Sequence, residues 1–202
     1  HSISNLTVGQ LGIFGLINGG TVKNVTVRGS VSGSSNAAGI VGYLNAGKAE
    51  NCGNNASVSG GSAVAGVVGY VGGASVISGC YNSGDIKGTT GYIGGVTGQH
   101  WQAGEVTDCY NSGTVTGPAT VGGVVGGFKR ATTVVTNCYN AGQVADSAGR
   151  SNNIGAVIGA SRGTNTNCYY IKGTGSDTKS GITETETLSA AALGAAFKED
   201  TD

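Results

Sequence analysis

A phrase built around Cys-Tyr-Asn recurs along this chain at nearly constant intervals. It reads "GCYNSG" from Gly79, "DCYNSG" from Asp108 and "NCYNAG" from Asn137. Successive cysteines of the chain lie 28 to 30 residues apart. A period of this length is typical of solenoids and related repeat architectures, so the repeat constrains the fold more than any other feature.

Two further anchors keep step with the cysteine phrase. One is a Gly-flanked aliphatic pair, such as "GIVG" from Gly39 and "GVVG" from Gly66. The other is an aliphatic residue that follows the Cys slot by six residues in five successive repeats, which indicates a rigid corner, whereas the remaining spacings vary as loops do. The residues of this second anchor are Val31, Val58, Ile86, Val115 and Val144.

Three short apolar segments per repeat, separated by Gly, Asn and Ser, predict one coil of a β-solenoid. We therefore predict an all-β fold over residues 1–171. It is a single parallel β-solenoid of about six coils of ~28 residues, each with three short strands, and right-handed as parallel crossovers usually are. The six-residue anchors should form one buried row.

The composition agrees with a thin, tightly turned β-structure. Gly accounts for 40 of 202 residues, and the apolar residues are mostly Val and Ile, which favour strands. Eleven basic and eleven acidic residues cancel, so electrostatics gives no reason to expect nucleic acid or an anionic membrane as a partner. The sequence has no long unbroken apolar run of the kind that predicts a transmembrane segment.

The C-terminal part, residues 172–202, departs from the repeat. A polar, linker-like stretch runs from Lys172 to Gly181. Thr183 and Glu186 then match a capping box, and a weak apolar stripe follows. We expect a short helix or cap here, with neighbouring domains of a larger chain beyond the repeats.

The Cys slot admits four interpretations: a metal site, a disulfide frame, a nucleophile, or a buried ladder. Zinc motifs place ligands two to four residues apart, not one repeat apart. In-register side chains of stacked coils point the same way, which disfavours disulfides, and His1 and His100 are the only histidines that could act as a base. Leu6 and Val25 fill the same slot earlier, so we favour a ladder of buried thiols without metal or cofactor: Cys52, Cys80, Cys109, Cys138 and Cys168.

The residues after each cysteine should form ladders of their own. Outward tyrosines should stack from coil to coil, and asparagine amides should hydrogen-bond between coils at a corner. Gly84, Gly113 and Gly142 should then allow a positive φ at the turn. The tyrosines are Tyr81, Tyr110, Tyr139 and Tyr169, and the asparagines are Asn54, Asn82, Asn111 and Asn140.

Two functional solenoid classes compete with a plain repeat domain. Polysaccharide-cleaving β-helices place acidic side chains side by side. The acidic residues in these repeats are few and scattered: Glu50, Asp85, Glu105, Asp108 and Asp146. Asp108 also occupies a slot that is typical of a turn residue. Ice-binding solenoids need unbroken outward Thr rows. Here Thr107, Thr136 and Thr166 align, but Lys23, Glu50 and Ser78 interrupt the row.

The loops after the Gly-flanked strands carry the most varied residues. "GQHWQ" contains the only Trp, and the next repeat carries "FKR". These residues suggest a sugar or protein contact strip, with shielding of the core edge as the alternative. The candidate contacts are His100, Trp101, Phe128, Lys129 and Arg130.

The "GIFG", "GIVG" and "GVVG" segments resemble the GLUG motif, and "NCYNAGQV" resembles its usual companion phrase. GLUG repeats occur in bacterial cell-surface proteins, including adhesin-like proteins and some immunoglobulin A-specific peptidases. The resemblance covers about residues 3–170; Ala156, Thr97 and Gly53 depart from the pattern.

The resemblance implies a secreted or cell-surface location and a non-catalytic role. The expected function is a stalk, a display scaffold or an adhesin segment that contacts glycans or host and extracellular proteins. A carbohydrate-binding or carbohydrate-cleaving β-helix is the alternative.

Overall fold

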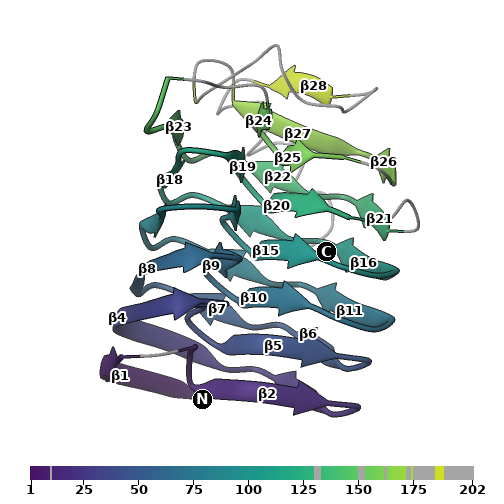
Figure 1. Ribbon diagram of the computed structural model, residues 1–202. Coiled ribbons are helices and arrows are strands. Elements are labelled where there is room, and N and C mark those ends of the chain that lie inside the picture. The colour runs from purple at the N-terminus through teal and green to yellow at the C-terminus, as the bar shows by residue number, and fades with distance from the viewer. Residues whose placement is uncertain are drawn as a thin grey trace.

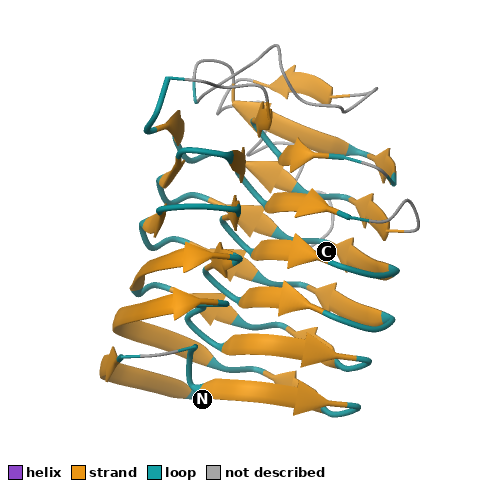
Figure 2. Cartoon of the chain, viewed as in Figure 1, coloured by secondary structure: helices purple, strands orange, loops and turns teal. Residues whose placement is uncertain are grey.

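The computed structural model of the 202-residue chain describes residues 1–9, 11–129, 133–149, 153–161, 163–171, 174 and 185–188. Short strands stack coil upon coil into a column, with the N-terminus at one end (Figure 1). The secondary structure of the described residues is strand, turn and loop, with no helix (Figure 2). The predicted parallel β-solenoid of about six coils is therefore confirmed.

Four parallel sheets form the walls of the column. Sheet A has two rows of strands, and sheets B, C and D have one row each. Sheet A contains β1 (Ser2–Val8), β4 (Thr26–Ser35), β7 (Gly53–Asn54), β8 (Ser57–Ser62), β12 (Tyr81–Asn82), β13 (Ile86–Gly88), β17 (Tyr110–Asn111), β18 (Val115–Gly117), β22 (Tyr139–Asn140), β23 (Val144–Asp146), β27 (Cys168–Ile171) and β28 (Thr185–Leu188).

The other three sheets complete each coil. Sheet B contains β2 (Phe14–Asn18), β5 (Val41–Asn45), β10 (Val68–Val71), β15 (Thr97–His100), β20 (Val125–Phe128) and β25 (Ile158–Ala160). Sheet C contains β3 (Thr21–Lys23), β6 (Lys48–Glu50), β11 (Ser75–Ser78), β16 (Gly104–Thr107), β21 (Thr133–Thr136) and β26 (Thr164–Thr166). Sheet D contains β9 (Val64–Ala65), β14 (Tyr92–Gly94), β19 (Thr120–Gly122) and β24 (Asn153–Gly155).

A complete coil thus has five short strands rather than the predicted three. The Gly-flanked segment is divided between sheets D and B, as in β14 and β15. The Cys-Tyr-Asn segment is divided at its asparagine, as in β12 and β13. In the first coil Val27 occupies the asparagine slot, and there β4 runs on unbroken for ten residues. The asparagine therefore marks the corner that splits the strand.

The asparagine makes this corner by bonding to its own chain. Nδ2 of Asn82 donates to the carbonyl of Gly84 at 2.8 Å, and the amide of Gly84 donates back to Oδ1 at 3.3 Å. Such a side-chain-to-backbone turn replaces the ladder contacts that would continue the strand.

A second corner lies directly before each Cys slot, where the chain adopts a positive φ. The residue types found there are those that tolerate the left-handed region best. The φ angles fall between 51° and 59° at Asn24, Asn51, Gly79, Asp108, Asn137 and Asn167. This agrees with the expectation that Asp108 is a turn residue. The expectation that Leu6 fills the Cys slot is wrong, because the register shifts within β1 and Leu6 pairs with Gly29.

The expected positive φ at Gly84, Gly113 and Gly142 is wrong. None of them has a positive φ. They are glycines because a Cβ would lie 2.0–2.1 Å from a carbonyl oxygen of the preceding coil. Close packing of backbones, not turn conformation, requires glycine at these positions.

The interior is divided into two apolar cores. The larger one is lined by sheets B and C and by the Cys slots. The smaller one lies between sheet D and the second row of sheet A. The five six-residue anchors stand in register along this smaller core, which confirms the predicted buried row: Val31, Val58, Ile86, Val115 and Val144.

At the C-terminal end the column is extended by a strand. Thr185–Leu188 form β28, which pairs in parallel with β27. The helix expected around Glu186 is therefore wrong for these four residues, while residues 189–202 lie outside the described part.

Candidate functional site

The structure separates the five predicted contact residues. Trp101 and Lys129 lie at the corner after sheet B, on neighbouring coils, and both are exposed. His100 and Phe128 point inward, at 0% and 1% exposure. Arg130 lies outside the described residues. The expected surface strip therefore does not include His100 and Phe128.

His100 occupies a core position. It pairs in register with Val71 on one side and Phe128 on the other, and its ring meets the Phe128 ring edge to face at 5.2 Å. Nε2 lies 3.0 Å from Oγ1 of Thr97, whereas Nδ1 has no hydrogen-bond partner. Burial lowers the pKa of His100 from 6.5 to about 3, because the apolar surroundings disfavour the charged ring. The ring is therefore neutral at ordinary pH.

The cysteines form a continuous buried row. All five are free thiols with at most 1% exposure. Sγ of Cys109 donates to the carbonyls of Thr107 at 3.1 Å and Ile77 at 3.7 Å, and the other thiols make equivalent contacts. Burial raises the pKa of Cys109 above its usual value and that of Cys168 to about 12. Cys109 and Cys168 are therefore protonated thiols, which are poor nucleophiles and poor metal ligands.

The asparagines form a hydrogen-bonded row inside the column. Nδ2 of each residue donates to Oδ1 of the next at 2.7 Å, from Asn54 through Asn82 and Asn111 to Asn140. All four are fully buried. Buried amides need such partners, so this row is a structural element of the coil-to-coil contact.

The tyrosines of sheet A stack face to face on the outside of the column. The rings of Tyr81 and Tyr110 are 5.3 Å apart and 9° from parallel, and those of Tyr110 and Tyr139 are 5.0 Å apart and 8° from parallel. Tyr81 lies over Gly53, where a Cβ would meet its ring at 2.2 Å. Burial and the neighbouring phenol raise the pKa of Tyr110. In this stack each inner ring face is covered by its neighbour, so ring edges face the solvent.

Sheet B carries a different aromatic surface. Its outward row runs in register from Leu16 through Tyr43 and Tyr70 to Gln99 and Gly127. Leu16 is 60% exposed and the next three are partly exposed. The Tyr43 and Tyr70 rings meet edge to face, 5.0 Å apart and at 90°.

Two residues from outside this row complete the surface. Tyr92 of sheet D lies over Gly127, where a Cβ would be 3.0 Å from its Cδ1. Nζ of Lys129 lies 5.2 Å from the centroid of the Tyr92 ring. The sequence prediction missed Tyr92 and Gln99. The signal that could have found them is the alignment of "VGGF" with "VGYV", which places Gly127, not Phe128, in the tyrosine row.

The acidic residues do not come together in one row. Glu50 and Glu105 both lie on sheet C, but Glu105 aligns with Lys48 through Val76, while Glu50 aligns with Thr107 through Ser78. The described residues contain no group of three or more His, Cys, Asp or Glu side chains that could hold a metal.

Sheet C also carries the predicted outward Thr row. Its members stack in register as expected, and charged residues interrupt the row at one end: Lys23, Glu50, Ser78, Thr107, Thr136 and Thr166.

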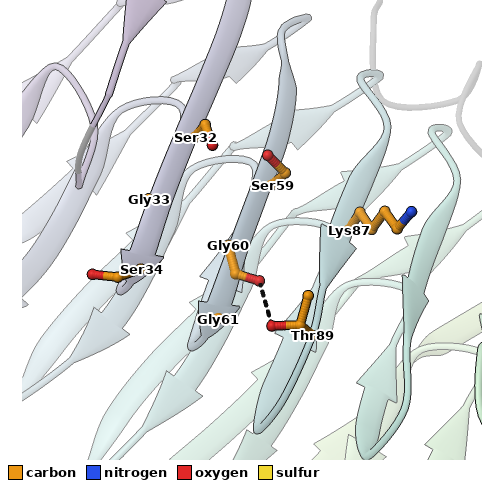
Figure 3. Close-up of a pocket in the computed structure, with 8 residues that line it drawn as sticks. All are labelled: Ser32, Gly33, Ser34, Ser59, Gly60, Gly61, Lys87 and Thr89. Carbon is orange, nitrogen blue, oxygen red and sulfur yellow. Dashed lines mark hydrogen bonds between the residues drawn. The ribbon is translucent and has the colours of Figure 1, made fainter.

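A shallow depression of about 480 Å³ lies outside β4, β8 and β13 (Figure 3). Serine and glycine residues of β4 and β8 line it, together with Lys87 and Thr89. Oγ1 of Thr89 donates to the carbonyl of Gly60 at 3.4 Å. The lining contains no acid or histidine, so this depression offers no acid–base pair.

Fold and interior rows together define a β-solenoid repeat protein whose coils share one internal pattern. The chain contains the GLUG motif, because the sequence model of that motif matches residues 89–116. These residues make up about one coil, from just before β14 of sheet D to β18 of sheet A. No curated protein matches the chain in sequence. Among the described residues, no helix is long and apolar enough to cross a bilayer.

The fold is similar to a crystal structure from Bacteroides ovatus described as a putative immunoglobulin A1 protease. The TM-score is 0.79 at 24% identity, and the alignment covers 96% of this chain and 69% of the other. At this identity the similarity shows the shared fold alone.

Proposed function

We propose that this chain is a non-catalytic, extracellular repeat domain of a bacterial surface protein. It serves as a stalk or display scaffold, or as an adhesin segment that contacts host or polysaccharide ligands.

The observation that carries the proposal is the contrast between the inside and the outside of sheet B. The inward row keeps to apolar residues of similar kind, such as Leu44 and Val71, with His100 held neutral in the same row. The outward row beside it changes from Leu16 through tyrosine to Gly127. Binding proteins place variable residues on a rigid framework in this way.

The framework suits a stalk because each coil is bonded to the next along all of its sheets. The asparagine row adds buried side-chain bonds between coils. The buried cysteines are compatible with an oxidising exterior, because an exposed thiolate is the reactive form.

A carbohydrate-cleaving solenoid is the competing proposal. It needs two carboxyl groups flanking one bond. Glu50 and Glu105 lie in different rows two coils apart, and Asp108 is held at its turn by Thr107 at 3.0 Å and Asn137 at 3.1 Å. This arrangement favours binding over cleavage.

Two measurements test the proposal. Antibodies raised against the chain should label intact producing cells as strongly as permeabilised ones, and the purified chain should leave immunoglobulin A1 and common polysaccharides uncut. Labelling only after permeabilisation would contradict the surface role. Cleavage by the isolated chain, abolished by Asp108→Asn or Glu105→Gln, would contradict the non-catalytic role.

A further inference from the structure

We propose that the outer face of sheet B is a platform for a neutral, linear glycan that runs along the axis of the column. The inference rests on the proposed function and names the ligand class that its adhesin form would bind. The platform consists of Leu16, Tyr43, Tyr70, Gln99 and Tyr92, with Trp101 at its edge.

Aromatic rings with open faces are the first requirement, because sugars present C–H groups that pack on ring faces. The Tyr43 and Tyr70 rings are at a right angle, so the edge of one ring meets the face of the other. The stacked rings of Tyr81, Tyr110 and Tyr139 on sheet A cover one another instead. In the edge-to-face pair of sheet B, the ring that contributes its edge keeps both of its faces clear of the other ring.

Glycines let the platform rings lie against the sheet. A Cβ at Gly72 would be 2.6 Å from Cε2 of Tyr43, so the Tyr43 ring lies over Gly72. Gly72 is at the corner after sheet B, one coil before Trp101. Tyr92 lies over Gly127 in the same manner. The aromatic groups therefore form a surface that extends over several coils instead of isolated projections.

Amide groups next to the rings supply hydrogen bonds for sugar hydroxyls. Asn45 donates to Oδ1 of Asn18 at 2.8 Å and accepts from the amide of Gly73 at 2.7 Å, which fixes both side chains. Within the described part of the chain, Nδ2 of Asn18 and the side chain of Gln99 make no hydrogen bond, so both can bond to a ligand.

The charge of the platform points to a neutral ligand. The six strands of sheet B contain no Lys, Arg, Asp or Glu, and His100 is uncharged. Lys129 stands at one end, and its ammonium group faces the Tyr92 ring. Among the described residues around this face, an acidic polysaccharide would meet Lys129, whose ammonium group already has a partner.

The spacing points to a linear ligand. Equivalent residues of neighbouring coils repeat at about 4.8 Å, which is close to the length of one sugar residue in an extended chain. The platform from Leu16 to Tyr92 extends over several coils, so an oligosaccharide with several residues would contact the whole platform and a short one only part of it.

Calorimetric titration of the whole chain with maltohexaose, cellohexaose, xylohexaose, mannohexaose and a hyaluronan hexasaccharide tests the proposal. We expect at least one neutral hexasaccharide to bind, and its trisaccharide to bind about tenfold more weakly. Tyr70→Ala should weaken binding about tenfold or more, as loss of a central aromatic contact does.

Tyr110→Ala is the matched control, because it removes the same side chain from the closed stack on sheet A; it should leave the affinity unchanged. Thermal unfolding checks that each variant folds, and Gln99→Ala replaces Tyr70→Ala if the latter does not. Absence of binding by every neutral hexasaccharide at about 10 mM would overturn the proposal. So would a preference for hyaluronan, or an equal loss with Tyr110→Ala. None of these outcomes would alter cell-surface labelling, so the two proposals fail separately.

Discussion

The neutral, buried ring of His100 should make the stability of this protein depend on pH in a way that one substitution removes. In the unfolded chain this ring takes up a proton as the pH falls below about 6.5, whereas in the folded chain its pKa is about 3. Between these values the unfolded state binds more protons, so stability falls as the pH falls. The loss is about 1.4 kcal/mol per pH unit and about 5 kcal/mol over the whole window.

His100→Leu should abolish this dependence. Leucine suits the row, since Leu44 occupies the equivalent position two coils earlier. It also removes Nδ1, which has no hydrogen-bond partner. Thr97 then loses its own partner, so the double variant with Thr97→Val is the cleaner one; Val68 already fills that slot. At pH 7 we expect the double variant to be more stable than the wild type by about 1–3 kcal/mol, the cost of a buried unpaired polar group.

Urea unfolding at pH 7, 6, 5 and 4 measures both effects. The carboxyl groups are common to both proteins, so their contribution cancels in the difference between wild type and variant. That difference should grow by about 1.4 kcal/mol for each pH unit below 6.5. Parallel pH profiles for the two proteins would refute the reasoning, because a solvated or protonated His100 would then have to replace the buried neutral one.

Four further substitutions test the interior rows and the corner. Cys109→Val should cost less than about 1.5 kcal/mol in urea unfolding, since Val25 fills the equivalent slot, whereas Cys109→Asp should cost more than about 3 kcal/mol by burying an unpaired carboxyl. Asn111→Ala should cost about 3–5 kcal/mol in the same assay, because it breaks bonds to both neighbouring asparagines and to Gly113 and leaves a cavity; a cost below about 1 kcal/mol would contradict the buried row. Trp101→Ala should change stability by no more than about 0.5 kcal/mol, yet weaken any contact centred on this corner by about 2 kcal/mol on a glycan and host-glycoprotein array, where profiles identical to wild type would exclude such a contact.

The period of the repeat predicted the fold because it reports contacts between coils directly. Residues such as Val58 and Ile86, at equal offsets in successive repeats, stand in register as the spacing requires. The number of strands per coil could not be predicted from the sequence. An internal corner such as that at Asn82 depends on the hydrogen bond from its side chain to the carbonyl of Gly84. Gly84 was misread for a related reason: sequence shows the glycine but not the carbonyl oxygen that excludes a Cβ.

The predicted site was only partly located, because a shift of one residue along a strand moves a side chain from one face to the other. The pair His100 and Phe128 was counted as surface because both follow a Gly-flanked strand. The structure aligns them with Val71 in the interior, while Gln99 and Gly127 take the outward position. Tyr92 could not be associated with this surface from sequence, because it comes from another sheet and reaches the platform only where Gly127 leaves room.

The paired glycines of the GLUG motif have a physical reason that links them to the asparagine row. A Cβ on Gly95 would lie 2.5 Å from Cγ of Asn111, and Gly39, Gly66 and Gly123 meet Asn54, Asn82 and Asn140 in the same way. The described chain also contains the matching exception, since Ala156 replaces this glycine in the coil where Tyr170 replaces the asparagine. The glycine and the asparagine amide thus pack closely against each other within each coil, between its two apolar cores.

The second glycine of the motif is also required by close contacts with the backbone. A Cβ on Gly98 would lie 2.5 Å from the carbonyl oxygen of Gly69 in the coil below and 2.8 Å from the backbone of Ala63. Both glycines are therefore needed for contacts inside the column. The motif then encodes the cross-section of the coil and leaves the outward residues of sheet B free to differ. This is why the GLUG pattern by itself specifies the fold of the coil, and why the proposed ligand preference rests on residues such as Tyr70 and Gln99 that lie outside it.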